Sequence, residues 1–347
     1  MQARERVKRA IHFQRPDHPP LLHGLVGGVR TLDFAWASDL AARYPDDFGF
    51  GRVPALPGVN RKFFLRGEPF ADAWGCTRQC SLDGMQSTIL RHPISTIADL
   101  AQFTPPPLNA SDFAGLQEQL TASGHPLYAV ASVLGVFDGM TNLCGMENLF
   151  CALADEENEL PRKLADLITT YIMRSLELIC DTEVDAVFLC DDWGTEISLF
   201  ISPELWRRFF KPRYKQLIDY AHAHGIDFWM HSCGNILPLI PDFIDLGVDA
   251  LHPQLELFLQ KPGFLSEIRG KLCIITDIDR HFLGVAQPQE VYARALQVFR
   301  ALHQPEGGMI LRGEIGISVP HANAEAFYQA CRDFQESVRP RRPYVVV

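Results

Sequence analysis

The sequence predicts a single α/β domain folded as a (β/α)8 barrel, also called a TIM barrel. From Pro126 onward, short apolar runs of strand type alternate with stretches of helical periodicity, which is the rhythm of a parallel sheet. About eight such runs occur in the 347 residues, and a barrel needs roughly 250 residues or more. A doubly wound open sheet is the competing architecture. No Gly-x-Gly-x-x-Gly fingerprint follows any of the runs, so the usual phosphate loop of a dinucleotide-binding half is missing.

The N-terminal third decorates this barrel. Residues 4–13 predict a short amphipathic helix, which the proline-rich stretch 14–20 ends before a first strand at 21–24. A second strand is expected near residue 50. Two aromatic-rich runs flank Arg-Gly-Glu-Pro between residues 61 and 79, and this pattern predicts a β-hairpin. We therefore expect one domain over residues 1–347, with helical and hairpin additions at its N-terminal end.

Strands and helices are expected to alternate through the rest of the chain. The strands are predicted at 127–133, 186–190, 226–230, 249–251, 272–275 and 309–311. The helices are predicted at 140–155, 159–181, 203–224, 236–246, 288–303 and 323–337. The helix at 203–224 has clear limits, because Ser202 before Pro203 is an N-cap signal and Gly225 stands where a C-terminal cap belongs. Pro212 inside this helix should kink it.

Composition argues against several classes of function. The formal net charge of −10 argues against a nucleic-acid partner, because proteins that bind the phosphate backbone carry a basic surface. The first ten residues form a charged helical start rather than a signal peptide, and no window reaches the roughly 18 apolar residues of a membrane span. Nine irregularly spaced cysteines fit reduced thiols better than a disulfide framework. We therefore expect a cytoplasmic protein without a membrane partner.

A histidine and a cysteine stand at the end of one predicted strand, in the run Phe228-Trp-Met-His231-Ser-Cys233-Gly234-Asn235. Side chains two residues apart in a strand point to the same side, so the imidazole and the thiol should converge. The pair makes half of a metal site, because zinc sites need three or four ligands. The alternative is a buried histidine bonded to backbone beside an inert buried cysteine.

Polar residues follow the other apolar runs as well, and in a barrel the chemistry collects at these carboxyl ends of the strands. The residues are Asp138, Asn142, Asp191, Asp192, Trp193, His231, Cys233, His252, Gln254, Asp277, Asp279, Arg312 and Glu314. The aspartates that follow strands could instead cap turns or helices, and His252 could be a buried, hydrogen-bonded histidine. Arg312 could be an ion-pair partner or a clamp for a substrate carboxylate. Their coincidence at six strand ends favours one shared site.

A set of motifs spread almost from end to end carries a family resemblance. The motifs are Arg4–Asp17, Asp72-Ala-Trp-Gly75, Asp191-Asp-Trp-Gly-Thr195, Ile201-Ser-Pro-Glu204 with Lys211-Pro212, His231-Ser-Cys-Gly234, Gly247-Val-Asp-Ala-Leu251, and Gly307-Gly-Met-Ile310 with Pro320. Together they resemble the uroporphyrinogen decarboxylase superfamily, specifically its branch of corrinoid-dependent methyltransferases. The resemblance implies a (β/α)8 barrel whose mouth receives a corrinoid protein or a pterin-type methyl acceptor.

This chain departs from the pattern of that superfamily at two places. The decarboxylases carry an N-terminal Arg-Gln-Ala-Gly-Arg motif for their acidic tetrapyrrole, whereas this chain has the stretch His23–Arg30 there. The thiol-methylating members bind zinc with the His-x-Cys pair and a second Cys before the final helix. Alignment on Pro320 and Asn323 puts Arg312-Gly-Glu-Ile-Gly316 at that place. Glu314 is then the candidate replacement, since zinc accepts carboxylates.

The resemblance implies methyl transfer. A methyl ether has a strongly basic leaving group, so a proton or a Lewis acid must activate it while the cobalt(I) of the corrinoid attacks the methyl group. We expect a methyltransferase that moves a methyl group from a methoxylated aromatic compound to a corrinoid protein. Catalysis is expected of His231, Asp191, Asp192 and Asp277, substrate binding of Asn142, Trp193, His252, Gln254 and Arg312, and metal binding of His231, Cys233 and Glu314.

Three other functions stay open at this point. The first is transfer from a methylcorrinoid protein to tetrahydrofolate or to a thiol. The second is decarboxylation of a smaller acid, with paired aspartates that stabilise a protonated ring. The third is a barrel that only binds a tetrapyrrole or a protein. The expected cofactors are a corrinoid carried on a partner protein, zinc, and tetrahydrofolate for the acceptor-side reaction, and the expected assembly is a monomer or a homodimer.

Overall fold

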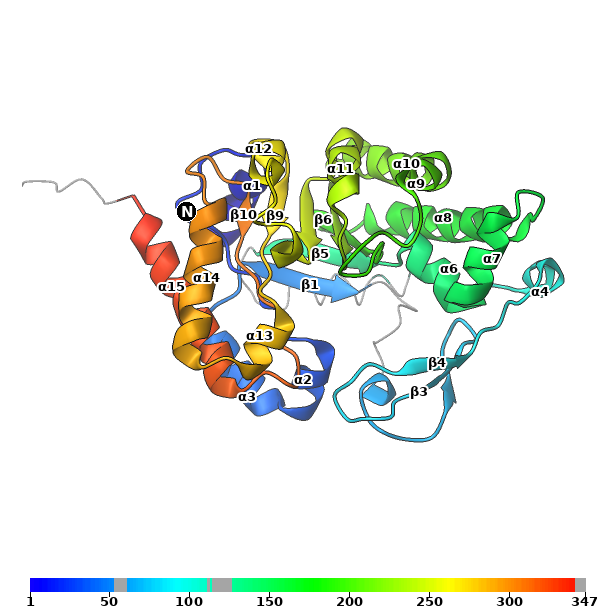
Figure 1. Ribbon diagram of the computed structural model, residues 1–347, viewed down its shortest axis with the longest axis horizontal. Helices are drawn as coiled ribbons and strands as arrows, with labels where there is room; N and C mark the ends of the chain where they lie inside the picture. The colour runs from blue at the N-terminus through cyan, green and yellow to red at the C-terminus, as the bar shows by residue number, and fades with distance from the viewer. Residues whose placement is uncertain (53–60, 111–112, 114–126, 341–347) are drawn as a thin grey trace, which may run out of the picture.

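Seven parallel strands form one curled sheet in the order β1-β5-β6-β7-β8-β9-β10 (Figure 1). The order in the sheet is the same as the order along the chain. The computed structural model describes residues 1–52, 61–110, 113 and 127–340. The strands are β1 Phe48–Arg52, β5 Tyr128–Val133, β6 Ala186–Cys190, β7 Asp227–Ser232, β8 Ala250–Pro253, β9 Cys273–Ile275 and β10 Met309–Ile310.

The segment 20–25 takes the eighth strand position and closes the barrel. Leu21 and Leu25 form parallel bridges to Leu311 and Ile315, just after β10. On its other side, the carbonyl oxygen of Leu21 accepts a 3.0 Å hydrogen bond from the backbone N–H of Asp47, next to β1. The predicted strand at 21–24 therefore contributes isolated bridges rather than a continuous ladder. The (β/α)8 fold class is confirmed.

Helices surround this sheet. Those before β5 are α1 Ala3–Ile11, α2 Gly27–Leu32, α3 Phe34–Arg43 and α4 Ile97–Gln102. Those after β5 are α6 Val136–Cys144, α7 Met146–Ala154, α8 Leu160–Ile179, α9 Pro203–Phe209, α10 Lys211–Ala223, α11 Ile240–Leu246, α12 Phe264–Ile268, α13 Arg280–Val285, α14 Pro288–Leu302 and α15 His321–Val338. Within the described ranges, no helix combines the length and the apolar character that crossing a bilayer requires.

Two of the predicted helices are each divided in two. The predicted helix at 203–224 breaks at Phe210 into α9 and α10, because Pro212 lacks a backbone N–H and starts a new helix instead of continuing the old one. Its predicted limits are confirmed, since the Ser202 side chain accepts a hydrogen bond from the Leu205 N–H and Gly225 has a φ of 72°. The predicted helix at 140–155 breaks at Gly145 into α6 and α7.

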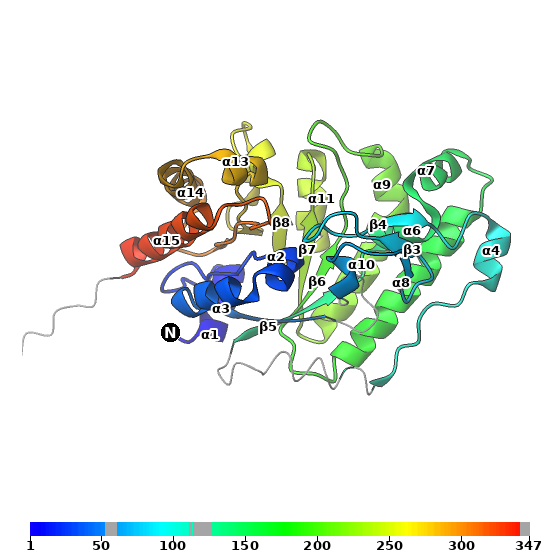
Figure 2. The ribbon, with the colours of Figure 1, turned by 90° about the horizontal axis from the view of Figure 1, so that it is seen from below.

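A small antiparallel sheet replaces the predicted hairpin at 61–79. Its strands are β2 Phe70–Ala71, β3 Thr77–Gln79 and β4 Thr88–Arg91, in the order β2-β3-β4. The first aromatic run forms the 3-10 turn Arg61–Phe63 instead of a strand, so this half of the prediction is wrong. The His92 side chain, just past β4, bonds the backbone of α6, and Figure 2 shows the small sheet beside this helix.

Alternate residues of the strands build two separate cores. Side chains such as Tyr128, Phe188 and Trp229 point inward and pack with Val7 and Ile11 of α1 in a cluster that fills the barrel. Their sequence neighbours point outward and join the larger cluster between sheet and helices, as expected for a period of two. This parity decides which polar residues at the strand ends reach the mouth of the barrel.

Candidate active site

The strand residues that point into the barrel are apolar along most of each strand and polar at the carboxyl ends, where they form a row. In the sheet register Cys190 of β6 stands beside His231 of β7, and His231 stands beside His252 of β8. The rings of His231 and His252 stack with their centroids 4.6 Å apart. Arg312, after β10, donates from Nη1 to Nε2 of His252 at 2.5 Å. Four separate strands thus bring these side chains into one row.

His231 is held in one orientation and one tautomer. Its Nδ1 lies 2.8 Å from the carbonyl oxygen of His252, which can only accept, so Nδ1 carries the proton. Nε2 is left to face two other groups, the Sγ of Cys233 at 3.4 Å and the Oδ1 of Asp192 at 3.4 Å. This is the arrangement of a ligating histidine, whose second nitrogen is fixed by a backbone carbonyl.

Asp192, His231 and Cys233 form a donor set suited to a metal ion. Their ligand atoms all lie within 4.8 Å of one another. A tetrahedral zinc site with bonds of about 2.0–2.3 Å has edges of roughly 3.3–3.6 Å between ligand atoms. The two distances from Nε2 fall in that range, so the residues fit zinc with little rearrangement. The converging His-x-Cys pair was predicted, but the third group near it is Asp192.

Glu314 lies elsewhere at the mouth. Its carboxylate is 3.5 Å from Nη1 of Arg280 and 3.8 Å from Nη2 of Arg312. It does not belong to the donor group formed by the described residues around His231. The structure therefore favours Asp192 over Glu314 as the third ligand.

Protonation of the metal-free pair follows from its contacts. Desolvation acts to lower the pKa of His231, but hydrogen bonds to Asp192 and Cys233 outweigh it and raise that pKa well above its usual value. Desolvation would raise the pKa of Asp192, yet the contact with His231 brings it down to about 2. A divalent ion would replace the proton of Nε2 in this ion pair.

The turn after Cys233 requires a glycine. Gly234 has a φ of 84°, in the left-handed region, and a Cβ there would overlap the carbonyl group of Gly194. The same turn is tied by a 2.8 Å hydrogen bond from the Cys233 N–H to Oδ1 of Asp192. The close approach of the loops after β6 and β7 thus sets the position of the Cys233 thiol.

Asp277 and Arg312 form the other side of the row. Oδ1 of Asp277 accepts a hydrogen bond from the Glu314 N–H at 3.1 Å. Burial raises the pKa of Asp277 to about 6, although the charge of Arg312 opposes this. Both side chains are partly exposed, so the structure brings together a carboxyl group that can hold a proton and a cation that can face an anion.

His252 lies beneath this surface. It is 2 % exposed, and desolvation together with the charges of Arg312 and His231 lowers its pKa well below the usual value. The imidazole is therefore neutral and accepts from Arg312. It supports Arg312 and His231 from below, and a substrate would meet those two residues first.

Asp191 and Trp193 do not reach the mouth. Asp191 is 0 % exposed and accepts from the N–H groups of Val136 at 2.9 Å and Asp138 at 2.7 Å and from the Tyr214 hydroxyl at 2.5 Å. Trp193 is 0 % exposed within an aromatic cluster of α6, α9 and α10. Both side chains point outward, because they continue the alternation of Val187 and Leu189, which point outward from the same strand. The catalytic role predicted for Asp191 and the substrate contact predicted for Trp193 therefore find no support in the structure.

Asn142 and Gln254 are partly buried and bonded to neighbouring elements. Oδ1 of Asn142 lies 3.5 Å from Nη2 of Arg78 in the small sheet. Oε1 of Gln254 accepts from the Gly234 N–H at 3.1 Å, and its Nε2 faces Glu196 at 3.4 Å. Gln254 thus supports the turn of Cys233, and Asn142 links α6 to the small sheet. Their predicted contact with substrate stays a prediction.

Two further residues of this region, Arg280 and Cys190, were not among the sequence candidates, and Asp138 was a candidate without an assigned role. Asp138, in the first turn of α6, lies near Asp192, and desolvation raises its pKa to about 6. Arg280 of α13 faces Glu314, with 3.5 Å between Nη1 and Oε1. Cys190 lies next to His231 in the register. Strand parity could have found Cys190, but no local pattern marks Arg280.

One motif of the sequence has a structural explanation. Residues 279–284 read Asp-Arg-His-Phe-Leu-Gly, which matches the Asp-x-His-x-x-Gly spacing of cobalamin-binding domains. Here the Asp279 side chain caps α13 by accepting a 2.8 Å hydrogen bond from the His281 N–H. This cap accounts for the aspartate, and the segment belongs to the barrel rather than to a separate domain.

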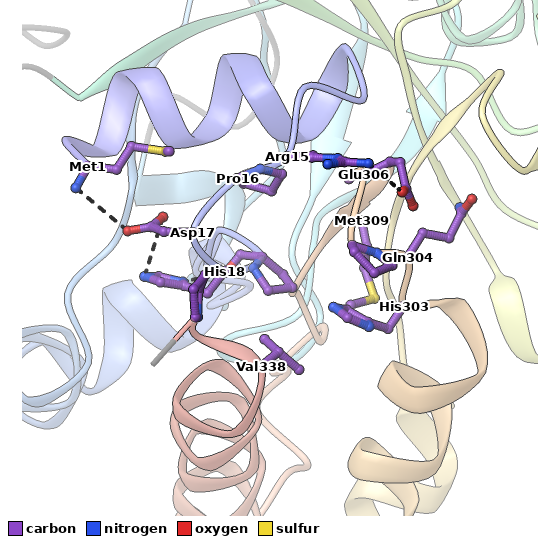
Figure 3. Close-up of a pocket in the computed structure, with 14 residues that line it drawn as sticks. Met1, Arg15, Pro16, Asp17, His18, His303, Gln304, Glu306, Met309 and Val338 are labelled. Carbon is purple, nitrogen blue, oxygen red and sulfur yellow. Dashed lines mark hydrogen bonds and ion pairs between the residues drawn. The ribbon is translucent and has the colours of Figure 1, made fainter. Parts of the chain in front are cut away.

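A groove of about 710 Å³ lies at the opposite, amino-terminal end of the strands. The segments 15–19 and 303–309 and the end of α15 line it. Figure 3 shows the ion pairs of Asp17 with Met1 and of Arg15 with Glu306 along its wall, with His18 next to Asp17. None of the predicted site residues lines it.

Fold and site together define a TIM-barrel protein with a metal-type donor set at the carboxyl ends of its strands. The model of the family described as "Uroporphyrinogen decarboxylase (URO-D)" matches residues 70–334, more than half of the sequence. The chain belongs to this family, and the resemblance found in the sequence is confirmed at that level.

One solved structure shares this fold over almost the whole length of both chains. A methyltransferase from Methanosarcina mazei superposes with a TM-score of 0.68 at 17 % identity, over 96 % of this chain and 99 % of that one. A dihydropteroate synthase from Anaplasma phagocytophilum matches with a TM-score of 0.39 at 15 % identity, over 61 % of this chain and 77 % of that one. A search of curated protein sequences found no match.

Proposed function

We propose that this protein is the methyltransferase of a corrinoid-dependent system and moves a methyl group from a methoxylated aromatic compound to a corrinoid protein. The observation that carries the proposal is the convergence of Asp192, His231 and Cys233 at the barrel mouth. The full-length superposition on the Methanosarcina mazei methyltransferase and the membership in the family support the same class.

Asp192, His231 and Cys233 would hold a zinc ion. Bound there, zinc supplies a Lewis acid that polarises the ether oxygen of the substrate. The chain itself fixes the imidazole through the carbonyl group of His252 and fixes the thiol through the turn at Gly234. These supports keep the ligands in place before any ion arrives, which lowers the cost of binding it.

Asp277 supplies the proton for the departing oxygen. Its pKa of about 6 lets a useful fraction of the carboxyl group stay protonated near neutral pH. Since Oδ1 already accepts from the Glu314 N–H, the proton belongs on Oδ2. A phenol leaves more readily than a phenoxide, so this proton lowers the barrier to methyl transfer.

Arg312 pairs with an anionic substituent of the aromatic substrate. Its Nη1 is committed to His252, while Nη2 lies 3.8 Å from Glu314 in a loose contact. A substrate carboxylate can replace this contact at little cost. Methoxylated benzoates are therefore the first substrates to test.

The test uses purified zinc-loaded protein, cob(I)alamin and a panel of methoxylated benzoates. We expect methylcobalamin absorbance with the unchanged chain and a rate at least about a hundredfold lower with His231→Ala. His281→Ala is the matched control, because His281 is exposed on α13 outside the donor set, and it should leave the rate unchanged. Absence of methylcobalamin with every methoxylated compound would contradict the proposal.

The same assay separates two other reactions. Methyl transfer from methylcobalamin to tetrahydrofolate or a thiol, without any from methoxyarenes, would identify the acceptor-side reaction. Decarboxylation is favoured by the family description and by the proximity of Asp277 and Arg312. Release of carbon dioxide from a small aromatic acid by the metal-free protein would identify it.

A further inference from the structure

A second group of metal-type donors lies at the amino-terminal end of the barrel, away from the proposed active site. His12 follows α1, Asp227 begins β7 and Asp249 precedes β8. Their ligand atoms lie within 4.8 Å of one another. Nε2 of His12 is 3.1 Å from Oδ1 of Asp227, close to the roughly 3.3 Å edge of a tetrahedral zinc site.

Neighbouring groups hold both carboxylates. The Tyr128 hydroxyl donates to Oδ2 of Asp227. The Phe228 N–H donates to Oδ2 of Asp249 at 2.7 Å, and Nε2 of His222 lies 2.8 Å from the same oxygen. These contacts orient each carboxylate through Oδ2 and direct Oδ1 of Asp227 toward His12. Fixed outer contacts of this kind are what metal ligands usually have.

The charges of this region suit a cation. Asp185 nearby is paired with two basic side chains, Arg4 and Lys8, each at 2.9 Å. Asp227 and Asp249 instead face the imidazoles of His12 and His222. The two carboxylates share one small region, and a divalent ion would balance their charge.

Solvent can reach the group. The side chains of His12 and His222 are 41 % and 38 % exposed, while those of Asp227 and Asp249 are 15 % and 17 % exposed. An ion could therefore enter from outside and take one or two water molecules as further ligands. One imidazole with two carboxylates suits borderline divalent ions such as zinc.

We infer that His12, Asp227 and Asp249 bind a divalent first-row metal ion of the zinc type, with His222 holding Asp249 in place. The ion would tie the end of α1 to β7 and β8 and so brace the closed base of the barrel. This site is separate from the proposed catalytic zinc and does not depend on the proposed function.

The test begins with metal-free full-length protein at pH 8, because protons compete with zinc for His12, whose pKa is raised by the hydrogen bond to Asp227. Zinc is added in equilibrium dialysis, and the bound metal is counted. We expect two ions per chain for the unchanged protein and one each for His12→Gln and His231→Ala. Glutamine keeps a donor toward Asp227 but is a poor zinc ligand, so folding should survive.

A thermal readout isolates the new site. Zinc should raise the melting temperature of His231→Ala, which retains only the basal site, and should not raise that of the double variant His12→Gln/His231→Ala. His303→Gln, a histidine outside both donor groups, should behave like the unchanged protein. The inference is overturned if His12→Gln binds as much zinc as the unchanged protein, or if the only zinc bound is the one lost in His231→Ala.

Discussion

Two adjacent carboxylates at the end of β6 illustrate how residue position decides a role. Asp191 points outward, is buried and accepts three hydrogen bonds that fasten the start of α6 and the Tyr214 hydroxyl. Asp192 points inward, is half exposed and faces Nε2 of His231. One side chain therefore belongs to the scaffold and its neighbour belongs to the site.

Asparagine substitutions should separate the two roles. Asp191→Asn turns one acceptor into a donor that opposes a buried donor, so we expect a loss of about 2 kcal/mol in the free energy of unfolding, with zinc binding unchanged. Asp192→Asn keeps the shape but removes the charge, so we expect zinc affinity to fall at least about tenfold with stability nearly unchanged. Urea denaturation and zinc titration measure both. Equal effects of the two variants would contradict this assignment.

Strand parity explains which site residues could be predicted from the sequence. The alternation places His231, Cys233 and Arg312 inward together, as expected for residues at the ends of parallel strands. The same rule applied to β6 would have separated Asp192 from Asp191 and Trp193. Arg280 could not be found in this way, because it lies on a helix whose position depends on the packing of the whole barrel. Asp138 was found as a polar residue after a strand, but its approach to Asp192 could not be predicted.

At the scale of elements, the turn between β7 and α11 carries the Cys233 thiol. Gly234 and Gly225 both have positive φ values, 84° and 72°, but only Gly234 lies against another backbone segment. Local patterns predicted the capped ends of α9 and α10. They could not show that Gly194 of a distant loop fills the space beside Gly234, because that contact forms only when β6 and β7 pair.

Alanine substitutions at the two glycines test the importance of this contact. Gly225→Ala adds only the strain of a left-handed residue, about 1 kcal/mol, because nothing lies within 4 Å of the added Cβ. Gly234→Ala adds a clash with Gly194 and should displace Cys233, so we expect a larger loss of stability and a drop in zinc affinity of about tenfold or more. If both variants bind zinc like the unchanged protein, the turn does not position the thiol.

At the scale of the whole molecule, two buried histidines lie where the barrel closes. His18 lies just before the segment 20–25 and His23 lies within it, and desolvation lowers the pKa of each to about 4. Nη2 of Arg339 donates to Nε2 of His18 at 2.8 Å, which requires a neutral ring. An unfolded chain binds protons at these imidazoles near pH 6.5, so acid favours unfolding.

The expected pH profile has a falling acid limb. Between pH 6.5 and about 4 the unfolded state binds more protons than the folded state, so stability decreases as pH decreases, on the order of 2 kcal/mol for each histidine. His12 and His222 have raised pKa values and act in the opposite direction, since their contribution is lost as pH rises through those values. His18→Gln should flatten the acid limb in urea titrations, whereas His224→Gln on the surface should leave it steep.

The strand β7 carries donors at both of its ends, with Trp229 between them in the apolar filling of the barrel. Asp227 and His231 are four residues apart and face the same interior, so ions at the two ends would sit roughly 13 Å from each other. Manganese or cobalt in both places would give two spins at a set spacing, separated by a stacked indole and phenol. The magnetic coupling between the two ions would then measure how constant the distance between the two ends of β7 is.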